Sequence, residues 1–378
     1  MSADFIPSDQ ASRSRIETEL ESTFFVEAGA GTGKTRELVQ RIVNLIREGR
    51  AEIGRIAAIT FTEAAAAELK DRVRFELEKY SVGPGLEDIQ RARCRTAAAG
   101  MDNAGIQTLH AFASSILREK PFEAGLPPNF QVLADIEESI DFEQNWQSWI
   151  DASMENAEVS GSLFTAMALG LKLDSLKGLA ASLQGDYDRL PDHFAAVAAP
   201  VRRAVCALAA ELDHIGGLIP LAINGEDDPL VRHARRLLAM GRRLALMDHS
   251  SDAALSLLRN FGKLDCSRGA QKDWLPNPSS KVNGCKELKE VCTDLEELRK
   301  DELERIRVAA LMPLLEGLRA FTLDCVQRRR SSGKALFQDL LIWARDMLRD
   351  NAAVRGYFQQ RYTHLLVDEF QDTDPIQA

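Results

Sequence analysis

Two short segments near opposite ends of the chain carry the residue types that bind phosphate groups and divalent cations. The first combines glycines with a lysine and a threonine, in the order Glu27-Ala28-Gly29-Ala30-Gly31-Thr32-Gly33-Lys34-Thr35. Glycines let backbone N–H groups turn toward phosphate oxygens, a lysine neutralises phosphate charge, and a threonine hydroxyl ligates magnesium. This segment predicts a phosphate-binding loop, with Ala28 in place of the usual first glycine.

The second segment is an acidic pair, Asp368 and Glu369, that follows the apolar run at residues 365–367. Magnesium prefers few carboxylates together with phosphate oxygens and water, which suits one aspartate at the end of a strand. A neighbouring glutamate can orient and deprotonate an attacking water. On its own such a pair is common at solvated strand ends, but together with the phosphate-binding loop it predicts one catalytic site formed by both ends of the chain.

Alternating strands and helices are expected to position these two segments. The loop follows a β-branched and aromatic run at residues 23–26 and precedes a helical stripe of apolar residues at 38–46. Residues 56–61 and 104–107 are further candidate strands, each followed by a helical pattern, at 64–77 and 112–118. This alternation predicts an α/β domain with a parallel sheet, and residues 365–367 should add a buried strand to it, beside residues 23–26.

The middle of the chain has a different pattern. Between residues 132 and 333 helical periodicity dominates, for example at 136–150 and 286–312, and Pro313 should break or kink the second helix at Met312. Residues 265–284 contain glycines and prolines typical of a surface loop. We therefore expect a helical insertion domain at residues 126–333, between the two parts of the α/β domain at 1–125 and 334–378.

Composition narrows the class of protein. The 378 residues suit two domains, with 45% hydrophobic and 28% charged residues and a net charge of −10. We expect no apolar run to reach the length of a membrane span, and the first residues lack the order of a signal peptide, so a cytoplasmic location is expected. Among the six cysteines, Cys266, Cys285 and Cys292 are close enough to suggest a metal site, but their spacing favours reduced thiols.

Further segments carry a resemblance to a known family. The segments Ile59-Thr60-Phe61-Thr62-Glu63-Ala64-Ala65-Ala66-Ala67-Glu68-Leu69, Gln107-Thr108-Leu109-His110-Ala111-Phe112 and Val367-Asp368-Glu369-Phe370-Gln371-Asp372-Thr373-Asp374 resemble early motifs of superfamily 1 DNA helicases. The resemblance is closest to the RecB- and AddA-like branch of the UvrD/RecB group. It implies a RecA-like P-loop NTPase domain with a helical insertion, using ATP and Mg²⁺. The implied activity is 3′ to 5′ movement on single-stranded DNA in DNA repair or recombination.

The resemblance implies roles for individual residues. Gln10 is similar to a glutamine that reads adenine, and Arg36 to a further nucleotide contact. Gln371 would link the γ-phosphate to the DNA site, acting in catalysis with Lys34 and Glu369. The implied residues around ATP and magnesium are Ala28, Gly29, Ala30, Gly31, Thr32, Gly33, Lys34, Thr35 and Asp368, and those around single-stranded DNA are Phe61, Thr62, Thr108, His110 and Phe112.

Several of these residues have a second interpretation. Without the motif context, the core is the favoured place for Phe61 and Phe112, and His110 is then typical of a hydrogen-bonded core histidine. Where some relatives carry Asn-Lys, this chain has Glu63-Ala64, which removes a phosphate-binding lysine. The basic residues Arg235, Arg236, Arg242, Arg243, Arg328, Arg329, Arg330 and Lys334 form either solvated helix faces or contacts to a DNA backbone.

The resemblance also implies a second motor domain, which would follow Ala378. We therefore expect an N-terminal motor half that shows little DNA-stimulated ATP hydrolysis and no strand separation by itself. The expected partners are single-stranded DNA or DNA with single-stranded tails; further candidates are a nuclease or a second helicase subunit, and no membrane is expected. The alternative is a non-translocating module that binds ATP and DNA. A P-loop kinase is a third interpretation, and the long insertion argues against it.

Overall fold

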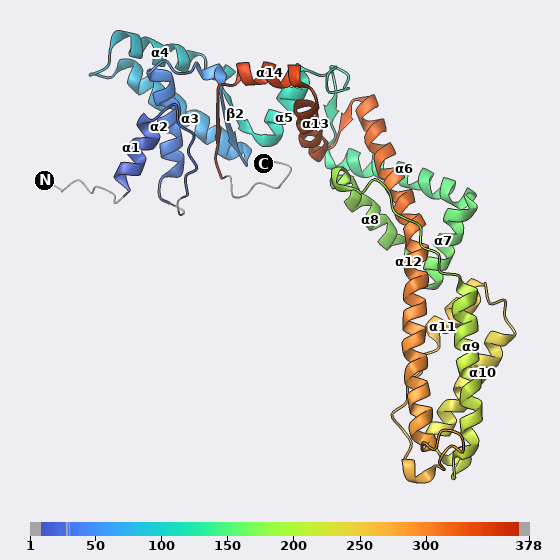
Figure 1. The fold of residues 1–378 in the computed structure, drawn as a ribbon. Coiled ribbons are helices and arrows are strands. Elements are labelled where there is room, and N and C mark those ends of the chain that lie inside the picture. Colours follow the sequence, from blue (N-terminus) through green and yellow to red (C-terminus); the bar gives the residue numbers. More distant parts are fainter. Residues whose placement is uncertain (1–8, 28, 30, 370–378) are drawn as a thin grey trace. The chain divides into compact units, whose positions relative to one another are not determined.

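The computed structural model describes residues 9–27, 29 and 31–369. They divide into two compact units (Figure 1). The α/β unit comprises Met1–Asp135 and Arg328–Ala378 within the described ranges, and the helical unit comprises Ile136–Gln327. The α/β unit is thus formed by the two ends of the chain, and the helical unit is inserted between them in the sequence.

The α/β unit is built on a three-stranded parallel sheet in the order β2-β1-β5. β1 (Ile56–Thr60) lies in the centre, between β2 (Gly105–Thr108) and β5 (His364–Val367). Ala58 pairs with Ile106 on one side and Leu366 on the other, and all three side chains are buried. This register places the carboxyl ends of the three strands at one edge of the sheet.

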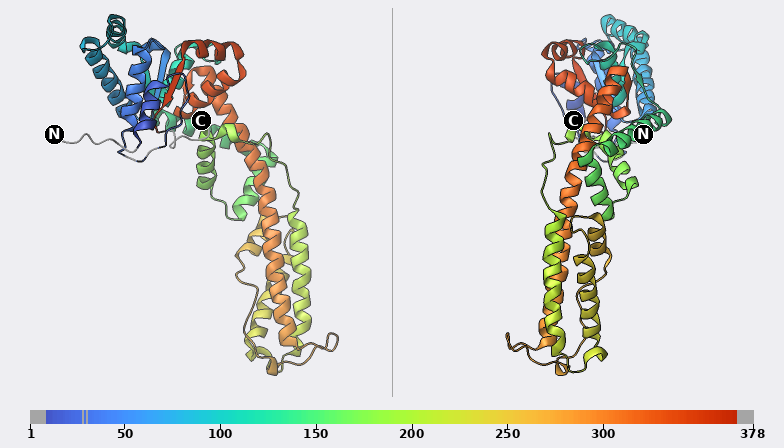
Figure 2. Two further views of the ribbon diagram at one scale, coloured as in Figure 1. Left: turned by 60° about the vertical axis from the view of Figure 1, so that its left-hand side comes forward. Right: turned by 90° about the vertical axis from the view of Figure 1, so that its right-hand side faces the viewer.

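Helices cover both faces of this sheet (Figure 2). The core beside Ala58 is formed with α2, α3 and α4, and α1 packs on α2. α5 contacts β1 and β2 from the other face and packs on α13, which in turn contacts α14. The bounds are α1 (Gln10–Thr18), α2 (Lys34–Arg47), α3 (Glu63–Val82), α4 (Asp88–Ala99), α5 (Leu109–Glu119), α13 (Phe337–Asp350) and α14 (Ala352–Arg361).

A two-stranded parallel sheet joins the two sequence segments of the α/β unit. It pairs β3 (Gln131–Val132) with β4 (Lys334–Ala335), and the Gln131 amide donates to the Gly333 carbonyl at 2.8 Å. Short 3₁₀ helices complete the described chain, at Ile53–Arg55, Met101–Asn103, Tyr187–Arg189, Ile219–Leu221, Gly225–Asp227 and Gln271–Asp273.

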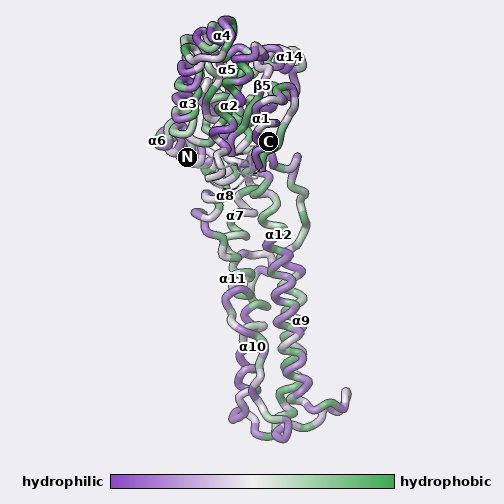
Figure 3. Tube along the Cα trace, turned by 90° about the vertical axis from the view of Figure 1, so that its left-hand side faces the viewer, coloured by the Kyte–Doolittle hydropathy of each residue, from purple (hydrophilic) through white to green (hydrophobic). Residues whose placement is uncertain are grey.

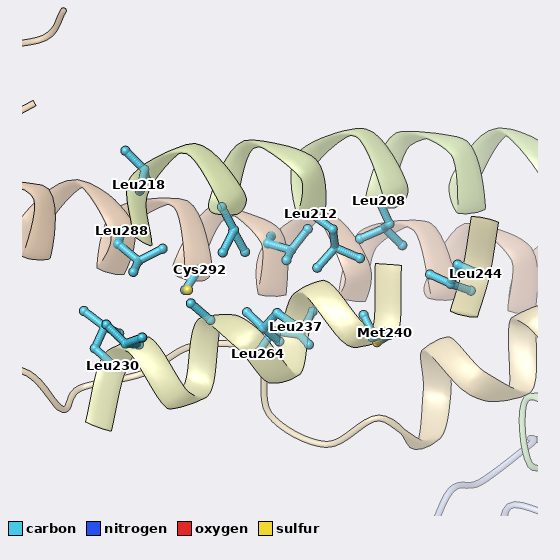
Figure 4. Packing of buried hydrophobic residues seen from close by; sticks show 14 of the residues in the cluster. Leu208, Leu212, Leu218, Leu230, Leu237, Met240, Leu244, Leu264, Leu288 and Cys292 are labelled. Atoms are coloured by element: carbon cyan, nitrogen blue, oxygen red, sulfur yellow. The ribbon is translucent and has the colours of Figure 1, made fainter. Parts of the chain in front are cut away.

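The helical unit contains separate apolar cores along its longest helix, α12. One core packs α9, α10 and α11 against the first part of α12, with residues such as Leu212, Leu237 and Leu288 in its centre (Figure 4). Another packs α6, α7 and α8 around Leu314 and Leu318 of α12. The bounds are α6 (Asp135–Glu155), α7 (Ala157–Ala168), α8 (Leu173–Gly185), α9 (Val201–Leu218), α10 (Pro229–Ala245), α11 (Asp252–Asn260) and α12 (Gly284–Ser332).

The prediction of a strand at residues 23–26 is wrong. The structure assigns no strand to these residues; Phe25 is 78% exposed and Val26 45% exposed. The segment is held by Arg41 instead, which donates to the carbonyls of Leu20 and Ser22 and lies over the Phe24 ring. β propensity reflects packing of the side chains against neighbouring strands, and the exposed side chains of Phe25 and Val26 lack such packing.

The sequence predicts a break or a kink at Pro313, and the break does not occur. α12 continues through this proline to Ser332. A proline inside a helix removes one backbone hydrogen bond and crowds the preceding turn. Here the helix is held by burial on the carboxyl side of the proline, where Leu314 and Leu318 are fully buried.

One helical segment, Val201–Leu221, is long and apolar enough to cross a membrane by length and composition alone. This corrects the expectation that no run reaches such a length. Hydrophobic and hydrophilic residues alternate along α9 (Figure 3). The residues Val205, Leu208 and Ile215 are fully buried in the core with α10 and α12, so one face of α9 packs inside the helical unit.

Candidate functional site

The glycine-rich loop leads directly into the first turn of α2. Gly31 and Gly33 have φ angles of 77° and 93°, a left-handed conformation that side chains disfavour. Gly33 caps α2, so Lys34, Thr35 and Arg36 form its first turn, with Arg36 exposed. Unpaired N–H groups and the helix dipole make this kind of terminus a binding site for phosphate.

The acidic pair lies beside this helix terminus. Lys34 Nζ is 3.8 Å from Glu369 Oε2, and the Asp368 amide donates to the Ile59 carbonyl at 2.9 Å. Glu369 has a φ of 58°, a strained conformation for a residue other than glycine. The structure therefore brings the two segments predicted to share one site to the same edge of the sheet.

The electrostatics of the pair favour a bound cation. Burial and, secondly, the Glu369 charge raise the pKa of Asp368, while Lys34 opposes this shift. Two carboxylates beside each other repel when both are ionised, and a divalent cation relieves that repulsion. With the Thr35 hydroxyl in the adjacent helical turn, this set of oxygen donors fits magnesium bound to a nucleotide phosphate.

Two threonines cap helices at the same edge. Thr62 precedes α3 and its Oγ1 accepts from the Ala65 amide at 3.1 Å. Thr108 precedes α5, accepts from the Ala111 amide at 3.3 Å and donates to Glu63 Oε1 at 2.9 Å. Thr62 is exposed, whereas Thr108 is buried and its hydroxyl is used inside the protein.

The three predicted aromatic residues have different surroundings. The His110 ring stacks on Phe337, with 3.7 Å between ring centroids and 18° between planes, and burial lowers the pKa of His110. Phe112 is half-buried and packs edge-on against Tyr362. Phe61 is 43% exposed at the carboxyl end of β1. Phe61 is thus accessible to a ligand, whereas Phe112 is part of the packing.

Other predicted residues are at the margin of the site or beyond the described ranges. Gln10 is the exposed first residue of α1, and Gly29 accepts a hydrogen bond from the Thr32 hydroxyl at 2.7 Å. The predictions for Ala28, Ala30 and Gln371 fall outside the described residues.

The cysteines and the arginine cluster that the sequence suggests as binding residues contribute to the packing of the protein instead. Cys285 and Cys292 are buried, burial raises the pKa of Cys292 to about 12, and no metal-binding group of three or more residues occurs in the described part of the chain. In the cluster before β4, Arg329 forms a buried ion pair with Asp339, and Arg330 donates to the Ala124 carbonyl at 2.9 Å. These two arginines therefore stabilise the fold of the α/β unit.

Sequence reasoning missed three residues of the site. Arg13 contacts the phosphate loop, Glu63 joins the starts of α3 and α5, and Phe337 stacks on His110. The sequence marks Glu63 only as a departure from relatives. Phe337 comes from a distant part of the chain, so no local pattern links it to His110.

Comparisons with known proteins agree with this geometry. Residues 8–378 match the family described as UvrD/REP helicase N-terminal domain. Relatives named as subunits of an ATP-dependent helicase/nuclease include those of Streptococcus sanguinis strain SK36 (26% identical, 93% of this chain, 32% of the relative) and Carboxydothermus hydrogenoformans (26%, 97% and 33%). The Ligilactobacillus salivarius protein is 35% identical over 36% of this chain and 12% of its own length.

This chain spans about a third of the length of relatives that match along most of it. It therefore corresponds to one part of those proteins, and distant homology to the AddA-type helicase/nuclease proteins extends over most of the chain. With a family match that covers nearly every residue, the chain belongs to the UvrD/REP helicase N-terminal domain family, a family of ATP-dependent helicases.

Proposed function

We propose that the α/β unit binds Mg²⁺-ATP at the carboxyl edge of its sheet and hydrolyses it as part of a DNA helicase motor. The observation that carries this proposal is the 3.8 Å contact between Lys34 and Glu369, which are near opposite ends of the sequence. Ligands of open α/β sheets bind at this edge, outside the carboxyl ends of the strands.

Each side chain has a role in this proposal. The amides of Gly29 to Thr35 and the Lys34 ammonium would hold the phosphates, with Gln10 at the adenine and Arg36 as a further contact. Thr35 and Asp368 would ligate magnesium, which supplies charge neutralisation at the phosphate oxygens. Glu369 would take the proton of the attacking water, and Lys34 leaves its ion pair with Glu369 when phosphate arrives.

Single-stranded DNA is the second ligand in this proposal. Thr62, His110 and the helix termini near them would contact phosphates, and Phe61 is a candidate for contact with bases. Thr108 and Phe112 would act mainly by holding this edge in shape, given their packing. The larger function is 3′ to 5′ movement on single-stranded DNA in repair or recombination, in the cytoplasm, and the protein partner would be a nuclease or a second helicase subunit.

Calorimetric titration with Mg²⁺-ATP tests the nucleotide part. Lys34→Ala should abolish measurable binding, because the phosphates lose their cation. Glu369→Gln is the matched control: it should bind at least as well as wild type, because it removes a negative charge and frees Lys34. Equal affinity of wild type and Lys34→Ala would refute the proposal.

A further inference from the structure

Arg13, in α1, makes a set of contacts that ties three segments of the α/β unit together. Its Nε and Nη2 donate to Asp9 Oδ1 and Oδ2 at 3.0 and 2.8 Å. Nη1 donates to Glu37 Oε1, in the first turn of α2, at 2.8 Å, and Nη2 also donates to the Thr32 carbonyl at 2.8 Å. The side chain is only 19% exposed, whereas that of Arg15 on the same helix is 64% exposed.

The contact to Thr32 has a consequence for the phosphate loop. A trans peptide is planar, so the Thr32 carbonyl and the Gly33 N–H point in opposite directions. Fixing the carbonyl on Arg13 therefore fixes the direction of the Gly33 N–H. Gly33 is the N-cap residue of α2, and its amide is one of the loop donors that a phosphate requires.

Arginine is suited to this position because its planar fork offers several donors in fixed directions. Asp9 holds one edge of the guanidinium from the start of α1, and Glu37 holds Nη1 from α2. The hydrogen bonds to Asp9 and then Glu37 raise the pKa of Arg13, so the side chain stays charged at every relevant pH. A lysine would offer the charge without this geometry.

We propose that Arg13 is a positioning residue that orients the Thr32–Gly33 peptide so that the phosphate loop is preformed for the phosphate chain of the nucleotide. The inference rests on the proposed nucleotide site. In this inference Arg13 affects the binding of the phosphate chain, and other residues contact the nucleoside. Losing Arg13 should therefore weaken binding of any ligand that carries the phosphate chain, with or without a nucleoside.

Glu37→Gln provides a matched control. Glu37 Oε2 is buried without a partner in the described structure, so the carboxylate depends on Arg13. Arg13→Gln and Glu37→Gln both break this ion pair and should both lower the melting temperature, Arg13→Gln by more because it also loses the contacts to Asp9 and Thr32. Only Arg13→Gln removes the hydrogen bond to the Thr32 carbonyl, because Asp9 still holds Arg13 in the Glu37→Gln protein.

The test measures binding of Mg²⁺-ATP and of Mg²⁺-tripolyphosphate to the full chain by calorimetry. Arg13→Gln should weaken both ligands by about tenfold, as expected for one charged hydrogen bond. Arg13→Lys should recover only part of the loss, and Glu37→Gln should bind both ligands nearly as wild type does.

Equal losses in Arg13→Gln and Glu37→Gln would overturn the inference, because Arg13 would then act only through the fold. It would also fail if Arg13→Gln weakened ATP but not tripolyphosphate, or weakened neither. These outcomes leave the nucleotide site intact. Absence of ATP binding by the wild-type chain would instead contradict the proposed function and this inference together.

Discussion

His110 and Phe337 show how single residues from distant segments make one surface. His110 lies in the first turn of α5, directly after β2, and Phe337 begins α13. Their stacked rings leave Phe337 59% exposed at the surface. An exposed aromatic ring backed by a second ring is a suitable platform for a nucleobase, because stacking accepts every base.

Phe337→Ala should weaken binding of a single-stranded oligonucleotide, measured by fluorescence anisotropy. Loss of one stacked base costs about 1–3 kcal/mol, which corresponds to roughly fivefold or more in affinity. Phe122→Ala is the control, since Phe122 is 77% exposed and also in the α/β unit. If both variants bind as wild type does, Phe337 is no part of the DNA site.

At this scale the sequence predicts residue types better than contacts. Lys34, Asp368 and Glu369 are predictable because phosphate and magnesium chemistry restricts the residues that can serve. The Glu63–Thr108 hydrogen bond and the Arg13 contacts depend on side chains brought together by the fold, so no local spacing indicates them.

At the scale of elements, patterns with a strong period are predicted correctly. β1, β2, β5, α2, α3 and α5 lie at the expected segments, but β5 is not the buried strand that the sequence predicts, because Leu365 is 64% exposed and Val367 38% exposed. Residues 23–26 have the composition of a strand but are not assigned as one, and two of their side chains are exposed. α12 continues through Pro313 because the packing of the following turns outweighs one lost hydrogen bond. Both failures arise where tertiary contacts override local preference.

The connection from α12 to α13 depends on a buried ion pair. Arg329 Nε donates to Asp339 Oδ2 at 2.8 Å, and the same oxygen accepts from the Leu336 amide at 2.9 Å. The Arg329 side chain is 5% exposed and that of Asp339 fully buried. The pair therefore joins the end of the long helix to the start of α13, where Phe337 lies.

Asp339→Ala should lower the free energy of unfolding by about 3–5 kcal/mol, because it takes the carboxylate partner from a buried arginine. Denaturant unfolding of the full chain measures the change. Glu68→Ala removes an exposed ion pair with Arg72 and should cost less than about 1 kcal/mol. Similar small effects of both substitutions would show that the buried pair contributes little.

For the whole molecule, charge is distributed unevenly. The chain has a net charge of −10, yet α10 carries five arginines and no acidic residue. Arg232, Arg235, Arg236, Arg242 and Arg243 are all exposed, and their spacing of three, four and seven residues places them on one helix face. Arg235 is ion-paired with Glu226, and Arg232 donates to the carbonyls of Glu226 and Asp227. The positive charge at Arg236, Arg242 and Arg243 fits a polyanion such as a DNA backbone.

Replacing Arg236, Arg242 and Arg243 by serine should weaken binding of double-stranded DNA and reduce the slope of log affinity against log salt. Each lost phosphate contact reduces this slope by about one. The control changes Arg305, Arg307 and Arg319, which are ion-paired with glutamates on α12, and alters net charge equally. Equal salt slopes in both variants would assign the α10 arginines to a solvated face.

The overall organisation follows from a change of periodicity along the sequence. The boundaries between the compact units lie between residues 135 and 136 and between residues 327 and 328. The sequence predicts the bounds of the insertion at residues 126 and 333. The predicted domain bounds stay a prediction. The separate cores along α12 could not be derived from the sequence, because the helical period alone does not tell which helices pack together.

The central claim is that Asp368, near one end of the sequence, completes a site whose phosphate loop is near the other. Titration of ATP with and without Mg²⁺ tests this most directly, comparing wild type with Asp368→Asn. In wild type Mg²⁺ should tighten ATP binding, and in Asp368→Asn most of this gain should be lost while ATP without metal binds at least as well. An unchanged Mg²⁺ dependence in Asp368→Asn would contradict the claim.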